Sequence, residues 1–135
     1  MPKHSFENYL STRINAEQPF ETLLRFPQFF EIETVNACNA RCPMCTIDEW
    51  TRHSPTMKMD VFHRIADEIG EHSDVVQRVS LYRDGEPLLD KRLPDRVAVL
   101  KDKGVRTISI ATNVSLLNEK MATDLLKAGI DHIIL

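Results

Sequence analysis

The stretch VRTISIATNVSLLNEKMATDLLKAGIDHIIL, residues 105–135, decides the fold class. Residues 105–112 and 130–135 are rich in β-branched side chains, which is typical of strands. Between them, residues 118–128 place Met121 and Leu125 one helical turn apart and end just before a glycine, as a helix does. A strand, a helix and a second strand in this order predict two parallel strands joined by a right-handed crossover.

The same pattern extends toward the N-terminus. Residues 29–35 (FFEIETV) and 75–82 predict two further strands. Residues 60–71 predict a helix with Asp60 as its N-cap, and a second helix is expected to end just before Gly104. The regular alternation of strands and helices predicts an α/β fold with a parallel sheet.

Length and composition favour one small domain. The chain has 135 residues, of which 42% are apolar, and this supports a single core rather than two. We expect residues 1–28 to form a helical or irregular N-terminal segment and residues 29–135 to form the domain. The expected last strand runs to Leu135, so we expect the sheet to continue in further sequence or in a partner chain.

Charge and hydropathy exclude several function classes. The formal net charge is −3, and the charges of both signs are mixed, whereas nucleic-acid binding needs clustered Lys and Arg. Polar residues interrupt the first ten positions, where a secretory signal would need an apolar run. No segment approaches the roughly 18 apolar residues of a membrane span. We therefore expect a cytoplasmic protein that binds neither nucleic acid nor membrane, and we interpret Asp95 and Arg96 as solvated helix surface.

The three cysteines of the chain, Cys38, Cys42 and Cys45, lie in one short loop after the first expected strand. Such spacing is too tight for a disulfide framework and indicates metal ligation. Closed 4Fe-4S carriers use four cysteines, so three would leave one iron open to another ligand. A structural zinc site completed by His53 is the alternative. Spacing alone leaves iron and zinc competing.

Parallel strands place their carboxyl ends at one rim, where ligands of α/β proteins bind. Here these ends are the cysteine loop, Asp84-Gly85-Glu86, and Thr112-Asn113. Thr107, Ser109 and Ala111 should share the cavity face of their strand, while Ile108 and Ile110 face the helices. Glu33 would point into the cavity or pair with a neighbouring arginine.

The segment ETVNACNARCPMC, residues 33–45, resembles the signature of the radical S-adenosylmethionine (SAM) superfamily. The resemblance implies that Cys38, Cys42 and Cys45 ligate a 4Fe-4S cluster whose fourth iron is chelated by the amino and carboxylate groups of SAM. It also implies that Met44, at a position that is often aromatic, contacts the adenine of SAM.

Two further segments resemble family motifs. The stretch from Asp84 to Leu89 is similar to the Gly-Gly-Glu-Pro segment that contacts the SAM amino group, with Asp84 replacing the first glycine. Gly85 would permit close backbone approach, and Glu86 could accept a bond from an ammonium group. Thr112-Asn113 resembles the Thr-Asn that closes the third strand in many members.

The resemblance implies a partial (βα)6 TIM-like barrel, truncated after about its fourth strand. It also implies an enzyme that reductively cleaves SAM to a 5'-deoxyadenosyl radical, which abstracts hydrogen from a small-molecule or peptide substrate. A flavodoxin or ferredoxin-type protein would donate the electron. The motifs are similar to those of members with a C-terminal auxiliary-cluster domain. The alternatives are a non-catalytic zinc or iron-sulfur fragment, and one half of a split enzyme.

Overall fold

The computed structural model describes residues 25–51 and 55–135, so the expectations for residues 1–24 and for His53 lie outside the described residues. A four-stranded parallel sheet has the order β1-β2-β3-β4. The strands are β1 (Phe29–Glu31), β2 (Arg78–Ser80), β3 (Thr107–Ala111) and β4 (His132–Ile134). The helices are α3 (Met59–Glu71), α4 (Leu93–Asp102) and α5 (Glu119–Ala128), with short 3-10 turns η1 (Ile47–Glu49) and η2 (Pro87–Leu89). The predicted α/β alternation is confirmed.

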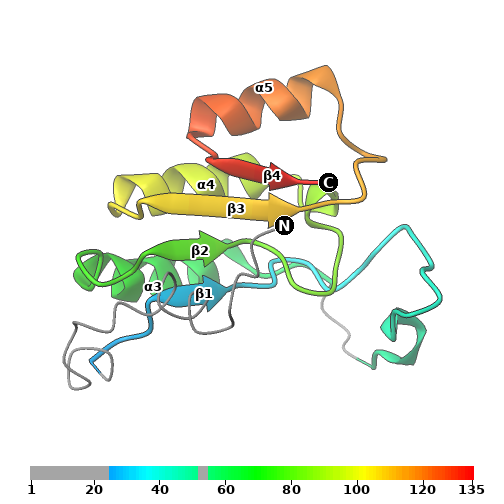
Figure 1. The fold of residues 1–135 in the computed structure, drawn as a ribbon, viewed down its shortest axis with the longest axis horizontal. Helices are drawn as coiled ribbons and strands as arrows, with labels where there is room; N and C mark the ends of the chain where they lie inside the picture. The colour runs from blue at the N-terminus through cyan, green and yellow to red at the C-terminus, as the bar shows by residue number, and fades with distance from the viewer. Residues whose placement is uncertain (1–24, 52–54) are drawn as a thin grey trace, which may run out of the picture.

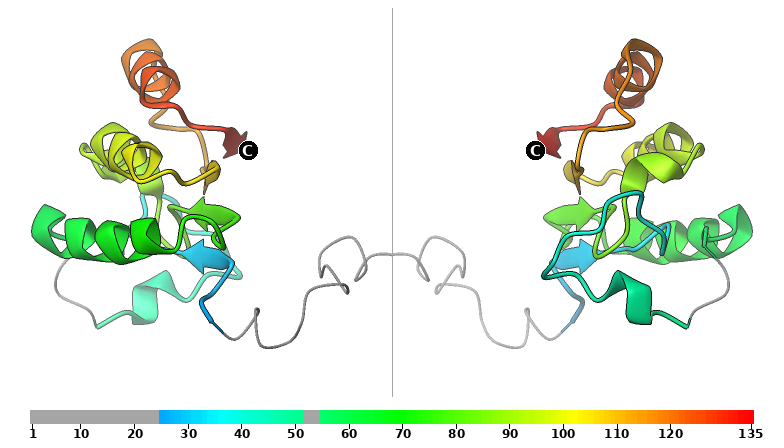
Figure 2. Two further views of the ribbon diagram at one scale, coloured as in Figure 1. Left: turned by 90° about the vertical axis from the view of Figure 1, so that its left-hand side faces the viewer. Right: turned by 90° about the vertical axis from the view of Figure 1, so that its right-hand side faces the viewer.

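Helices α3, α4 and α5 lie on one face of the sheet (Figures 1 and 2). The opposite face has no helix or strand over it in the part of the chain that the structure describes (Figure 2). This one-sided layering is the arrangement of a barrel wall, whose helices form the outer layer. The described residues contain no helix that is both long and apolar enough to cross a membrane.

Side chains alternate across the strands as predicted. Ile108 and Ile110 are fully buried in the core against the helices. Ser109 points to the opposite face, where its hydroxyl is 3.0 Å from that of Ser80 on the neighbouring strand. The helix-facing side of the sheet is thus apolar, and its other face carries small polar groups.

Helix ends agree with the sequence at α5 and differ at α3. The Asn118 side chain accepts a hydrogen bond from the Met121 amide at 2.9 Å, and the helix ends at Gly129, which adopts a left-handed φ of 92°. The prediction that Asp60 caps α3 is wrong. Lys58 is the N-cap, in extended conformation, and Asp60 lies in the first turn. Its negative charge there still interacts favourably with the helix dipole.

The strands are shorter than predicted because backbone groups near their ends bond to loops and helix ends instead of to the neighbouring strand. Beyond β1, the Thr34 carbonyl accepts from the Met57 amide at 2.7 Å, and Val35 forms an isolated antiparallel bridge with Thr56. Before β2, the amides of Val75 and Val76 bond back to the helix end. The first strand therefore ends at Glu31, four residues earlier than its side-chain pattern predicts.

A buried ion pair joins α4 to the loop after β2. Arg96 Nε lies 2.6 Å from Asp90 Oδ2, and both side chains are 1% exposed. The guanidinium also donates to the Met57 carbonyl and lies 4.8 Å from the ring centroid of Phe62. The interpretation of Arg96 as solvated surface is wrong, because a carboxylate, a carbonyl and an aromatic ring from three other segments surround it.

Candidate functional site

An open cleft of about 290 Å³ lies at the carboxyl ends of the strands. It is lined by loops that follow β1, β2 and β3, which Figure 1 shows meeting at the same side of the sheet. Of the eight residues that the sequence singles out, six line it: Cys38, Cys42, Gly85, Glu86, Thr112 and Asn113. Cys45 and Met44 are not among the lining residues, and Met44 is 83% exposed.

The cysteine loop leaves its thiols open to one side. Cys38 is half-buried, and Cys42 and Cys45 are exposed and free. The Cys45 amide bonds to the Cys42 carbonyl at 2.9 Å, and Arg41 donates to the carbonyl of Cys38 at 2.8 Å. These local bonds fold the loop into turns that project the second and third cysteines away from the core.

The donor set fits an iron-sulfur cluster with one open iron. Among the described residues, no three His, Cys, Asp or Glu side chains are grouped closely enough to hold one metal ion. A cubane cluster instead attaches each thiolate to a different iron, so its ligands surround a cube rather than one point. Three soft thiolates, of which those of Cys38 and Cys42 line the cleft, suit such a cluster and would leave its fourth iron for another ligand.

Gly85 is required by a close approach between two loops. A Cβ atom at this position would lie 2.0 Å from the carbonyl oxygen of Val35 and 3.1 Å from that of Ala37. The next amide, that of Glu86, donates to the Ala37 carbonyl at 2.8 Å. The loop after β2 therefore lies directly against the backbone that leads into the cysteines.

Glu86 connects the same loop to the end of β3. Its carboxylate, 3% exposed, accepts hydrogen bonds from the Thr112 hydroxyl at 2.6 Å and the Asn113 amide at 2.9 Å. A third bond, from the Leu88 amide at 3.0 Å, caps η2. These bonds use three of the roughly four acceptor positions of a carboxylate, so Glu86 fixes the cleft wall and has one position left for a ligand.

A hydrogen-bond network that sequence reasoning missed joins the β3 loop to the cysteine loop. Asn113 Nδ2 donates to Asn39 Oδ1 at 2.9 Å, and Asn39 Nδ2 donates to Ser115 Oγ at 2.7 Å. Between them, Val114 has a φ of 58°, a left-handed conformation that costs energy for a β-branched residue. In the sequence, the signal for this loop is Asn-Val-Ser, which is typical of a turn.

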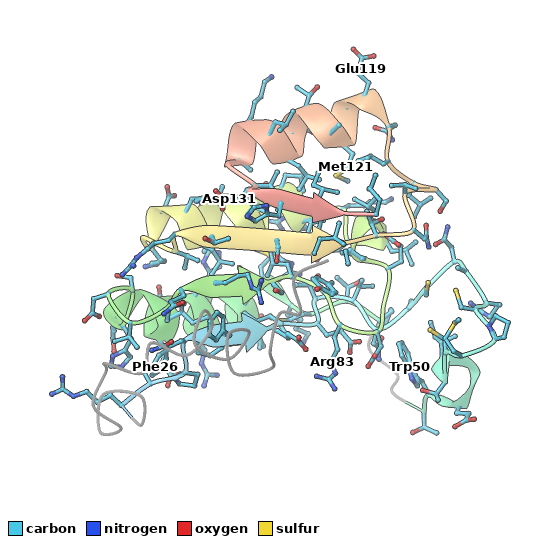
Figure 3. The ribbon with its side chains drawn as sticks, viewed as in Figure 1. Phe26, Trp50, Arg83, Glu119, Met121 and Asp131 are labelled. Carbon is cyan, nitrogen blue, oxygen red and sulfur yellow. The ribbon has the colours of Figure 1, made fainter. Side chains whose placement is uncertain are left out.

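Glu31, the last residue of β1, and Asp84, in the loop after β2, both pair with Arg83 at the rim of the cleft. Arg83 lies 3.2 Å from Glu31 Oε2 and 3.6 Å from Asp84 Oδ2, and Figure 3 shows it at this edge of the sheet. The Asp84 amide lies 3.4 Å from Glu33 Oε1. Glu33 thus has a backbone partner at the rim.

The profile of the Radical SAM superfamily matches residues 32–135. The chain belongs to this superfamily. The family uses a 4Fe-4S cluster and SAM, in agreement with the cofactors expected from the sequence.

Curated relatives of this radical SAM chain have several different activities. The tungsten-containing aldehyde ferredoxin oxidoreductase cofactor-modifying protein of Pyrococcus furiosus is 30% identical over 104 residues. The PqqA peptide cyclase of Granulibacter bethesdensis is 36% identical over 102 residues. The GTP 3',8-cyclase of Desulforamulus reducens is 31% identical over 109 residues. These alignments cover 77%, 75% and 78% of this chain but only 29%, 26% and 32% of the relatives.

Solved structures agree with the fold. The crystal structure of BtrN in complex with AdoMet and 2-DOIA matches with a TM-score of 0.71 and 25% identity, over 79% of this chain and 44% of that one. An open conformation of BtrN gives a TM-score of 0.70. The radical SAM chain therefore has the architecture of a partial radical SAM barrel, as predicted.

Proposed function

We propose that Cys38, Cys42 and Cys45 bind a 4Fe-4S cluster and that the adjoining cleft binds SAM, in a protein that acts as a radical SAM enzyme. The observation that carries this proposal is the position of Cys38 and Cys42 in one cleft with the loops after β2 and β3. When bound, the reduced cluster supplies the electron that cleaves SAM to methionine and a 5'-deoxyadenosyl radical, which takes a hydrogen atom from the substrate.

The protein's own residues position these groups. Gly85 allows the cleft wall to lie against the cysteine loop, and the remaining acceptor position of Glu86 would accept a hydrogen bond from the SAM amino group. Thr112 and Asn113 form the next part of the wall. Met44, exposed on the cysteine loop, offers a polarizable contact to the adenine.

The whole protein's partners follow from the same proposal. We propose a small-molecule or peptide substrate and a flavodoxin or ferredoxin-type electron donor in the cytoplasm, where thiols stay reduced. We also propose that residues 29–135 belong to the radical SAM core domain and that residues 1–28 precede it as an N-terminal segment.

The test is anaerobic reconstitution with iron and sulfide, followed by metal analysis and EPR of the reduced protein with and without SAM. We expect about four irons per chain, an EPR signal that changes when SAM is added, and release of 5'-deoxyadenosine. Cys42→Ser should lose the cluster, whereas Thr123→Ala, on α5 and away from the cleft, should keep it. Stoichiometric zinc, or a cluster indifferent to SAM, would contradict the proposal and favour a non-catalytic metal-binding protein.

A further inference from the structure

Cys38 differs from the other two cysteines in its surroundings. It is half-buried, whereas Cys42 and Cys45 are exposed. Two N–H groups approach its sulfur: the Ala40 amide at 3.4 Å and the Asn113 side-chain amide at 3.9 Å. The second donor comes from a loop 75 positions away in the sequence, so it depends on the tertiary fold.

The orientation of the Asn113 carboxamide is determined by its neighbours. Its Oδ1 atom accepts from the Ser115 backbone amide at 3.1 Å and from the Ser115 hydroxyl at 2.6 Å. A backbone N–H can only donate, so the oxygen of the carboxamide must face Ser115. The NH2 group is therefore the end that faces Asn39 Oδ1 and the sulfur of Cys38.

The backbone of Asn113 is held as firmly as its side chain. Its amide donates to the buried carboxylate of Glu86 at 2.9 Å. On its other side, Val114 keeps a left-handed φ of 58°, and its amide bonds to the Thr112 hydroxyl at 3.1 Å. Strain of this kind persists only where the surroundings over-determine the conformation. The donor group thus has a fixed position before any cofactor binds.

We infer that Asn113 is a positioning residue that donates an N–H···S hydrogen bond to the Cys38 thiolate and raises the reduction potential of the cluster bound there. Hydrogen bonds to ligating sulfurs stabilise the more negative, reduced state of a cluster. Asn39 and Ser115 hold the carboxamide in place. The inference rests on the proposed function, and it assigns to Asn113 a role toward the cluster in addition to its place in the cleft wall.

The first test compares midpoint potentials, measured by mediator-based redox titration with EPR detection in the absence of SAM. Asn113→Leu has a similar size but no donor, and we expect a full iron and sulfide content with a more negative midpoint potential. Asn39→Leu, which loosens the carboxamide, should shift the potential less and in the same direction. Leu116→Ala, in the same loop but with a side chain 36% exposed, should leave it unchanged.

The second test needs no variant that could fail to fold. Wild-type protein labelled with 15N in the asparagine side-chain amides should show a 15N coupling to the reduced cluster in pulsed EPR. A cluster that forms in the wild type but shows no such coupling, or an Asn113→Leu potential equal to that of the wild type, overturns this inference and leaves the proposed function standing. Failure of the wild type to assemble a 4Fe-4S cluster overturns both.

Discussion

Gly85 and Gly70 tolerate a side chain to very different degrees. At Gly85 an added Cβ meets the Val35 carbonyl oxygen at 2.0 Å, and this backbone atom belongs to the segment that enters the cysteine loop. At Gly70, in α3, the nearest atoms are Cβ and Cδ of Lys103, both at 3.1 Å, and a shift of a few tenths of an ångström relieves this contact. A side chain at Gly85 would therefore disturb the site, whereas alanine can replace Gly70.

Gly85→Ala should therefore destabilise the protein by about 3 kcal/mol or more, at the upper end of overpacking effects, and should impair cluster assembly. The measurements are urea denaturation of the apoprotein and iron content after reconstitution. Gly70→Ala is the matched control, because the gain in helix propensity offsets the shift of Lys103, and its stability should stay within about 1 kcal/mol of the wild type. Equal stability of the two variants would argue against the close approach at Gly85.

At the next scale, one arginine connects several elements. Arg96 of α4 bonds to Asp90 after β2 and to the Met57 carbonyl before α3, and its Nη1 atom has no partner among the described residues. Asp90 also accepts from the Arg92 amide at 2.9 Å. Removing any of these partners would leave the buried Arg96 charge less well compensated. The stability of α4, of the loop after β2 and of the segment before α3 is therefore coupled.

Asp90→Ala should lower the free energy of unfolding by about 3–5 kcal/mol, because it leaves the Arg96 cation buried without its counter-charge. The joint replacement Asp90→Leu with Arg96→Met should cost less than Asp90→Ala alone, since no isolated charge remains. Chemical denaturation of the three proteins measures both effects. Asp95→Ala breaks the exposed pair with Arg92 and should cost about 0–1 kcal/mol. A similar loss for the buried and exposed variants would contradict the structural role of Asp90.

The sequence predicted the elements better than it predicted their ends and their contacts. The C-terminal end of α5 was readable because Gly129 acts on its own helix end. The cysteine spacing indicated a metal site for the same local reason. The burial of Arg96 and the bonds of Asn113 were not readable, because their partners lie in other segments and become neighbours only when the sheet has formed.

At the scale of the whole molecule, Asp131 links α4, β3 and the start of β4 (Figure 3). Its Oδ2 atom accepts from Lys101 Nζ and from the Ile108 amide, both at 2.7 Å. Burial opposes ionisation of this carboxyl, but the hydrogen bonds from Lys101 and Ile108 outweigh it and hold the pKa of Asp131 below its ordinary value of 3.8.

This lowered pKa predicts a pH dependence of stability. The folded state binds the Asp131 proton less readily than the unfolded state, so the contribution is present above pH 3.8 and is lost as the pH falls through the folded pKa. Asp131→Asn should cost about 1 kcal/mol at pH 7, after discounting for solvent exposure. Its deficit relative to the wild type should shrink below pH 3.8.

Denaturation curves at several pH values measure that deficit. The control is Asp124→Asn, which removes the surface pair with Lys120 on α5 and should change stability by only about 0.3–0.5 kcal/mol. A deficit of Asp131→Asn that stays constant from pH 7 to the acid range would contradict the role of its charge.

The sheet order β1-β2-β3-β4 is also the order of synthesis. Each of β2, β3 and β4 pairs with the strand that precedes it in the chain, so these strands can pair in the order in which they are synthesised. The nascent chain can therefore add one strand-helix unit at a time, starting from the end that carries the thiols. The cysteine loop and the β2 loop can meet while Asn113 is still being translated, so the contact at Gly85 can form before the Asn113 side chain reaches Cys38.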